Sequence, residues 1–150
     1  MKNILVVAPL SIPTSGAEEI VNTKLLKILS DSNEFSIDLI SRDKIKGTYP
    51  SISSPDDFGI KIREFFPLRV DNKFNFTTAL QHFQTLLKFG TVSKGAHWAY
   101  EAAKVADYLI TRYNYAYILT KSFPSSLVGA YLKKKYGIKW VATWNDPFPA

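Results

Sequence analysis

Hydrophobic positions along the chain fall either in short continuous runs or at helical spacing. Continuous apolar runs predict strands at Asn3–Ala8, Phe35–Ile40, Ile60–Phe65, Tyr117–Thr120 and Ile138–Thr143. Apolar residues three and four positions apart predict helices at Ala17–Ser30, Thr77–Phe89, Ser93–Tyr113 and Ser125–Tyr136. The long polar segment between residues 42 and 58 contains two prolines and predicts an irregular surface excursion. The order is therefore β-α-β-loop-β-α-α-β-α-β.

The same spacing predicts which side chains of each helix face the sheet. The first helix has its apolar positions at Ala17, Ile20, Val21, Leu25, Ile28 and Leu29, and the second at Leu80, Phe83 and Leu87. The third helix has the longest stripe, made of Trp98, Ala102, Val105, Ala106, Leu109, Ile110 and Tyr113. His82 and His97 each stand alone on a predicted helix, and we expect partly exposed side chains rather than metal ligands.

Strands that alternate with helices predict an α/β fold. Right-handed crossovers arrange these elements as a doubly wound, mostly parallel Rossmann-like sheet, in the order 3-2-1-4-5, with helices on both faces. Strands 1 and 4 are then neighbours, and the winding reverses between them. Ligands bind such sheets at this switch point, beyond the carboxyl ends of the strands. The loop Pro9–Gly16 and the turn Lys121–Ser125 should flank this crevice, with Trp144–Phe148 beside them.

Composition narrows the class of protein. The chain has 150 residues, about one domain, and 46% of them are hydrophobic, which is enough for a core. The absence of cysteine excludes a disulfide scaffold, a thiol nucleophile and cysteine-based zinc sites. With only two histidines, we expect no metal site. No apolar run reaches the roughly 18 residues of a spanning helix, so we expect a cytoplasmic protein.

The net charge of +6 is unevenly distributed. Residues 1–60 hold six Lys and Arg against eight Asp and Glu, whereas residues 61–150 hold thirteen against five. This asymmetry predicts one basic face, which either keeps the protein in solution or meets an anionic lipid surface, a phosphate-bearing substrate or nucleic acid. Phenylalanines at 65, 66, 74 and 76, interleaved with Arg63, Arg69 and Lys73, suit base stacking, membrane insertion or packing over the sheet edge.

The loop after the first strand opens onto a helix N-terminus, which attracts anions. Ser15 and Glu18 have the spacing of a capping box. The loop contains a single glycine, Gly16, so the dinucleotide fingerprint and the P-loop pattern are both absent. Gly16 either lets the backbone turn into the helix or lets a substrate approach the amides of Ser15 and Gly16.

The turns after the fourth and fifth strands supply the other candidates. Lys121 and Ser122 follow the fourth strand, and Ser125 is expected to cap the next helix. No G-x-S-x-G elbow is present, so these serines are not predicted nucleophiles. The proline after Asp146 favours extended geometry for that residue. The side chains of Asp146 and Asn145 could orient a sugar hydroxyl or act in proton transfer, or could merely complete an Asx-turn. Trp144 could form an apolar substrate wall or cover the sheet edge.

These features together resemble a known family. The segment TKSFPSSLVGAYLKKKYGIKWVATWNDPF is similar to the N-terminal domain of family 4 glycosyltransferases of the GT-B fold. In many of these a strand with Ser-rich residues and Pro precedes a Lys-rich helix and a strand that ends in Asp-Pro-Trp. The opening ILVVAP, with its loop and helix, is also similar. This chain has Phe148 in place of that Trp, Asn145 where some members have His, and Ser15-Gly16 in place of two glycines.

The resemblance implies that residues 1–150 are the acceptor-side half of a two-domain, retaining glycosyltransferase. The donor, a nucleotide-sugar, would be bound mainly by a C-terminal domain that lies outside this chain, so the chain alone should be inactive. Neither a metal nor another cofactor is implied. The expected partners are a sugar or lipid-linked acceptor, an anionic membrane surface at its inner face and the missing donor-binding domain.

Two other hypotheses stay open. The same sheet order would serve a stand-alone, flavodoxin-like binding or regulatory module for a small phosphate-bearing ligand, which would bind at Ser15–Ala17. Nucleic-acid binding through the basic aromatic stretch ranks last, because the sequence contains no recognised nucleic-acid motif. The donor sugar, the acceptor and the linkage are not determined by the sequence.

Overall fold

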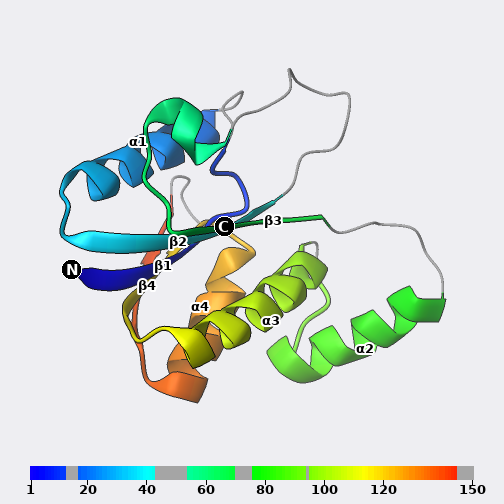
Figure 1. Cartoon of the computed structure of the whole chain (residues 1–150). Coiled ribbons are helices and arrows are strands. Elements are labelled where there is room, and N and C mark those ends of the chain that lie inside the picture. The colour runs from blue at the N-terminus through cyan, green and yellow to red at the C-terminus, as the bar shows by residue number, and fades with distance from the viewer. Residues whose placement is uncertain (13–16, 43–53, 70–75, 94, 145–150) are drawn as a thin grey trace.

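A computed structural model of the chain describes residues 1–12, 17–42, 54–69, 76–93 and 95–144 (Figure 1). The strands of this part are β1 (Lys2–Val7), β2 (Phe35–Arg42), β3 (Glu64–Leu68), β4 (Tyr115–Lys121) and β5 (Lys139–Thr143). The helices are α1 (Ala17–Asp31), α2 (Phe76–Phe89), α3 (Ala96–Arg112) and α4 (Ser125–Tyr136), with a short 3-10 helix, η1 (Pro55–Phe58). None of these helices is long and apolar enough to cross a membrane.

The strands form one sheet in the order β3-β2-β1-β4-β5, and every pairing is parallel. The predicted Rossmann-like arrangement is confirmed. The bounds of the third strand were misplaced, because the sheet pairs Glu64–Leu68 rather than Ile60–Phe65. Ile60 enters the core ahead of the strand, as a fully buried side chain. Pro67 is tolerated within β3 because an edge strand does not need every N–H.

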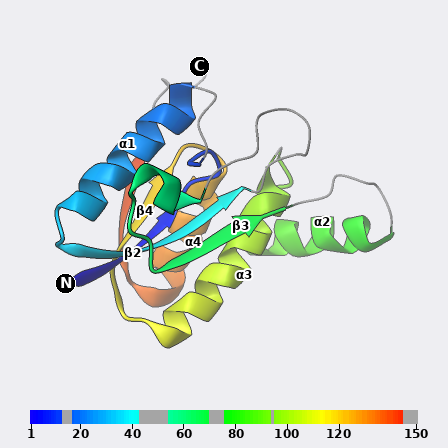
Figure 2. The same ribbon diagram turned by 45° about the horizontal axis from the view of Figure 1, so that its top comes forward.

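Helices cover the two faces of the sheet unequally (Figures 1 and 2). Successive side chains of a strand point to opposite faces, so β1 contributes to two cores. Ile4 and Val6 pack with Leu26 of α1, whereas Leu5 and Val7 pack with α3 and α4. Trp98 and the alanines of α3 are fully buried in the second core, which confirms the predicted stripe of that helix.

The inward face of α1 differs from the prediction. Its buried residues are Asn22, Thr23, Leu26 and Ser30, whereas Ile20, Val21 and Ile28 are exposed. The polar pair tethers the helix to the loop after β1. Asn22 Nδ2 donates to the carbonyl of Leu10 at 2.6 Å, and Thr23 Oγ1 donates to that of Ser11 at 2.8 Å. Loop carbonyls that need donors have therefore rotated the helix away from its most apolar side.

The face of α2 is also opposite to the prediction. Leu80, Phe83 and Leu87 point to solvent, whereas the polar side of the helix meets α3 and α4. His97 Nε2 lies 2.8 Å from His82 Nδ1, and the rings form a T-shaped pair, so these histidines are not isolated as predicted. Tyr100 donates its hydroxyl to Gln84 Oε1 at 3.0 Å.

A second polar cluster, centred on Asp107 of α3, completes this attachment. Asp107 accepts hydrogen bonds from the hydroxyls of Tyr131 and Tyr136, both at 2.8 Å, and from Lys135 Nζ at 3.1 Å. Lys88 of α2 lies 3.6 Å from the same carboxylate and 4.3 Å from the centre of the Tyr131 ring. Burial opposes ionisation of Asp107, but these donors outweigh it and lower its pKa. Three helices are thus joined by one carboxylate.

The histidine pair predicts that acid destabilises the fold. Burial, and then the nearby His82, lower the pKa of His97. The unfolded chain therefore binds protons more readily, so the free energy of unfolding should fall as the pH drops below about 6.5. Urea denaturation between pH 8 and pH 5, which avoids carboxylate titration, measures this slope. Replacing His97 by glutamine should flatten it, and an unchanged slope in that variant contradicts the assignment.

A buried carboxylate also lies within the sheet, in β2. Asp38 is fully buried and accepts hydrogen bonds from Arg63 Nε at 3.0 Å and from the backbone N–H of Glu64 at 3.1 Å. Arg63 Nη2 and the Tyr115 hydroxyl donate to its second oxygen. The guanidinium of Arg63 also lies 3.7 Å from the centre of the Tyr113 ring. This network connects β2, the entry to β3 and the start of β4 at the amino edge of the sheet.

Candidate functional site

The carboxyl ends of β1 and β4 lie side by side, with Val7 opposite Thr120. From there the chain runs from β1 to α1 on one face of the sheet and from β4 to α4 on the other. The winding reverses between these strands, as predicted. Ligands of open α/β sheets bind at this switch point, so we take it as the candidate site.

Two predicted residues, Lys121 and Ser122, occupy the end of β4. The Lys121 side chain is only 4% exposed, and this burial lowers the pKa of its amino group while the charge of Glu18 opposes the shift. Ser122 has a left-handed backbone, with φ of 61°, and its hydroxyl donates to Glu18 Oε1. A cation, a hydroxyl and a carboxylate from two distant segments therefore meet at the switch point.

The turn from β4 into α4 is closely packed. A Cβ atom on Gly95, which has φ of 88°, would lie 2.9 Å from Pro124 Cγ, so the start of α3 can approach this turn only with a glycine there. Ser125 is the first residue of α4 and not its cap, which corrects the prediction. Its hydroxyl donates to the carbonyls of Lys121 and Ser122, both at 2.7 Å. The backbone of both candidate residues is thereby held in place.

Replacing Ser125 by alanine should lower the free energy of unfolding by about 1–2 kcal/mol, because two inward carbonyls lose their donor. The side chain is fully buried, so water cannot readily replace it. Chemical denaturation followed by tryptophan fluorescence measures the loss. Ser126→Ala, one position further along α4, is the matched control and should change stability by less than about 0.5 kcal/mol. Equal effects of the two substitutions contradict the assigned role.

The end of β5 lies beside the same turn. Lys121 is opposite Thr143, and the N–H of Ser122 donates to the Thr143 carbonyl at 3.0 Å. Trp144 follows directly and is 38% exposed. The structure therefore brings together Lys121, Ser122 and the strand end that carries Trp144, as the sheet order predicts. Trp140 packs on the other side, where its indole N–H donates to Thr120 Oγ1 at 2.9 Å and its ring covers Gly129.

Four predicted site residues, Ser15, Gly16, Asn145 and Asp146, lie outside the described residues and stay predictions. Glu18 is the residue that sequence reasoning missed as part of the site, because the pattern assigned it only to a capping box. An acidic residue in the first turn of the helix that opens onto the switch point was the available signal. Its contact partner, Ser122, is 104 positions away along the chain.

The chemistry of the described site suits a ligand that carries hydroxyl groups. The Glu18 carboxylate accepts hydrogen bonds, Ser122 can both donate and accept, and Lys121 contributes positive charge. Within the part of the chain that the structure describes, no three histidine or carboxylate side chains converge as metal ligands would.

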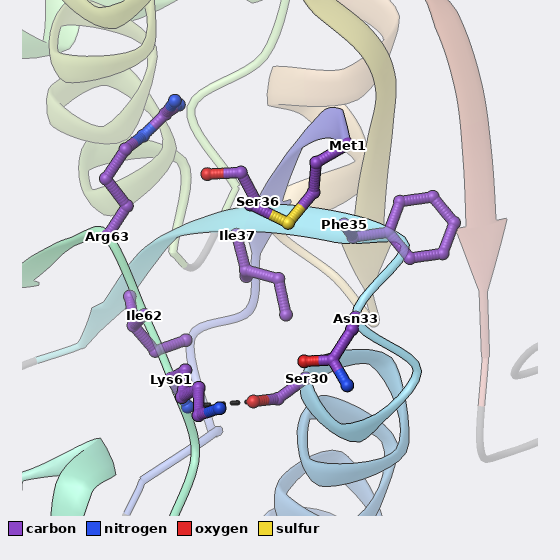
Figure 3. Close-up of a pocket in the computed structure, with 9 residues that line it drawn as sticks. All are labelled: Met1, Ser30, Asn33, Phe35, Ser36, Ile37, Lys61, Ile62 and Arg63. Carbon is purple, nitrogen blue, oxygen red and sulfur yellow. Dashed lines mark hydrogen bonds between the residues drawn. The ribbon is translucent and has the colours of Figure 1, made fainter.

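Two pockets lined by described residues lie at the opposite, amino edge of the sheet. The first has a volume of about 360 Å³ and is lined by residues of α1, β2 and the segment before β3 (Figure 3). Figure 3 shows that the Arg63 guanidinium points away from the dashed contact between Lys61 and Ser30, and it is already paired with Asp38. The second, of about 390 Å³, lies around Tyr113 and Tyr136. Neither coincides with the switch point.

Comparisons with known proteins support the fold. No family model and no curated protein matches the sequence. Among solved structures, sucrose-phosphate synthase from Thermosynechococcus elongatus matches with a TM-score of 0.59 and 18% sequence identity. The match covers 97% of this chain and 33% of that one, so the chain spans about a third of the length of this neighbour. The neighbour is a glycosyltransferase of the GT-B fold, and the likeness indicates a glycosyltransferase-like fold for this chain.

Proposed function

We propose that this chain is the acceptor-binding, N-terminal domain of a nucleotide-sugar-dependent, retaining glycosyltransferase of the family 4 type. The observation that carries the proposal is the meeting of Lys121, Ser122 and Glu18 at the switch point of a glycosyltransferase-like fold. Hydroxyl-rich sugars need several donors and acceptors within a small area, and this site supplies them. The sequence resemblance at residues 117–148 points to the same class of enzyme.

Each predicted residue has a role in this proposal. Lys121 and Ser122, with the backbone amides of Ser15 and Gly16, hold the acceptor, and Trp144 provides an apolar wall for the sugar ring. Asp146 and Asn145 orient the reacting hydroxyl. The nucleotide-sugar donor is held mainly by a second α/β domain that lies outside this chain, so residues 1–150 alone do not catalyse transfer. No metal takes part.

Binding of acceptors by the chain tests this role. Amide signals of a ¹⁵N-labelled sample are followed during titration with monosaccharides, disaccharides, sugar phosphates and nucleotide-sugars. We expect an acceptor sugar to shift the signals of Lys121, Ser122 and Trp144, because their backbones line the switch point. Ser122→Gly removes the hydroxyl yet tolerates the left-handed backbone, and should abolish these shifts. Ser126→Ala serves as the control and should preserve them.

Three outcomes count against the proposal. Shifts confined to the amino-edge pockets would place binding elsewhere. Tight binding of a nucleotide or sugar phosphate to this chain alone favours the flavodoxin-like module. Persistence of the sugar-induced shifts in Ser122→Gly would remove Ser122 from the site. The two-domain organisation has its own test, since the reading frame of the parent protein should encode a second α/β domain with paired glutamates beyond residue 150.

A further inference from the structure

The two layers of helices carry opposite charge. Helices α2, α3 and α4, which lie on the same side of the sheet, hold six cations against two carboxylates, a net charge of +4. On the other side, α1 and η1 hold two lysines against five carboxylates, a net charge of −3. The basic second half of the sequence is therefore folded into one layer. A surface of that sign attracts anionic partners.

An apolar surface lies within this basic layer, on the outer side of α2. Leu80, Phe83 and Leu87 are 53%, 57% and 71% exposed, and Leu86 is also exposed. Residues three and four positions apart fall on the same side of a helix, so these four side chains form one continuous stripe. We call Leu80, Phe83, Leu86 and Leu87 the outer face of α2. The helix projects from the body of the molecule in both views (Figures 1 and 2).

The polar contacts of α2 fix the orientation of this face. Gln84, His82 and Lys88 are bound to residues of α3, and Thr85 is fully buried. Turning the helix to bury its leucines would expose new apolar surface elsewhere and break these contacts. The helix carries no carboxylate, and its only ionisable side chains are His82 and Lys88. Its outer face is thus uncharged and apolar, and it is surrounded by a layer with excess positive charge.

We propose that the outer face of α2 docks on an anionic lipid surface. Apolar side chains enter the acyl boundary of the bilayer, while cations of the surrounding helices meet the lipid phosphates. The charge of the layer distinguishes this occupant from a second copy of the chain, because two basic layers would repel one another. The inference goes beyond the proposed function and does not depend on it, because the switch point lies elsewhere in the fold.

Co-sedimentation of the whole chain with vesicles tests the proposal. Phosphatidylcholine vesicles that contain phosphatidylglycerol should bind the chain, and vesicles of phosphatidylcholine alone should bind it markedly less. High salt should weaken binding through screening of the charges. The variant Phe83→Gln/Leu87→Gln should bind about tenfold more weakly or worse, because both side chains lose their apolar contact with lipid. Both positions are exposed, so its thermal unfolding should match that of the wild type.

The matched control is Ile20→Gln/Ile28→Gln on the acidic layer, which removes two exposed apolar side chains of α1 and should leave vesicle binding unchanged. Failure of the wild type to bind anionic vesicles overturns the proposal, as does equal binding by the α2 variant. Equal binding to both kinds of vesicle overturns the role of charge. A dimer in sedimentation velocity that the α2 variant abolishes, without vesicle binding, assigns the face to a second copy instead.

Discussion

Replacing Arg63 by methionine should lower the free energy of unfolding by about 3 kcal/mol, which is the largest effect that we expect from a single polar substitution in this chain. Methionine keeps most of the aliphatic packing but removes the guanidinium. Asp38, which is fully buried, then retains only the Glu64 amide and the Tyr115 hydroxyl as partners. A buried carboxylate that loses its counter-charge is strongly destabilising, because neither water nor a second cation reaches it.

The pair can be separated from its surroundings by a double-mutant cycle. Asp38→Asn in the Arg63→Met background removes the buried charge and should restore part of the lost stability. Arg112→Met provides the exposed counterpart, because Arg112 pairs with Glu64 at 3.2 Å near the surface and should contribute less than about 1 kcal/mol. Urea denaturation measures all four proteins. A loss below about 1 kcal/mol for Arg63→Met would show that the network contributes little.

Replacing Gly129 by alanine should destabilise the protein by about 2–3 kcal/mol, although alanine is the better helix former by about 1 kcal/mol. A Cβ atom at this position would lie 2.1 Å from Trp140 Nε1 and 2.5 Å from Trp140 Cε2. The indole must then move away from α4. That movement breaks its hydrogen bond to Thr120 and loosens the packing of β5, the strand that leads to Trp144.

A smaller residue at position 140 tests the cause of that loss. In the Trp140→Val background the added methyl group of Gly129→Ala has room, so alanine should be neutral or stabilising there. Denaturant midpoints of the two single variants and the double variant give the coupling between the sites. An equal loss in both backgrounds would mean that the glycine is needed for a reason other than the indole.

Local patterns predicted most of the fold. Short apolar runs placed the strands at the centre of the sheet, and the alternation with helices gave the order 3-2-1-4-5. That order also brought Lys121, Ser122 and the end of β5 to the switch point. These features could be predicted because periodicity and crossover handedness follow from backbone geometry, which acts within a few residues. The stripe of α3 was predicted for the same reason, since its apolar side meets an apolar sheet.

Only the tertiary structure decided which way the other helices face and which charges meet. The sequence by itself assigned Ile20 and Ile28 of α1, and Leu80, Phe83 and Leu87 of α2, to the core, but these residues are exposed. Loop carbonyls near Asn22, and the partners of His82 and Lys88 on α3, outweigh the apolar side of each helix. The pairs Glu18–Ser122 and Asp38–Arg63 join residues 104 and 25 positions apart. A periodicity specifies an apolar side, but the partners of buried polar groups are known only once distant segments have come together.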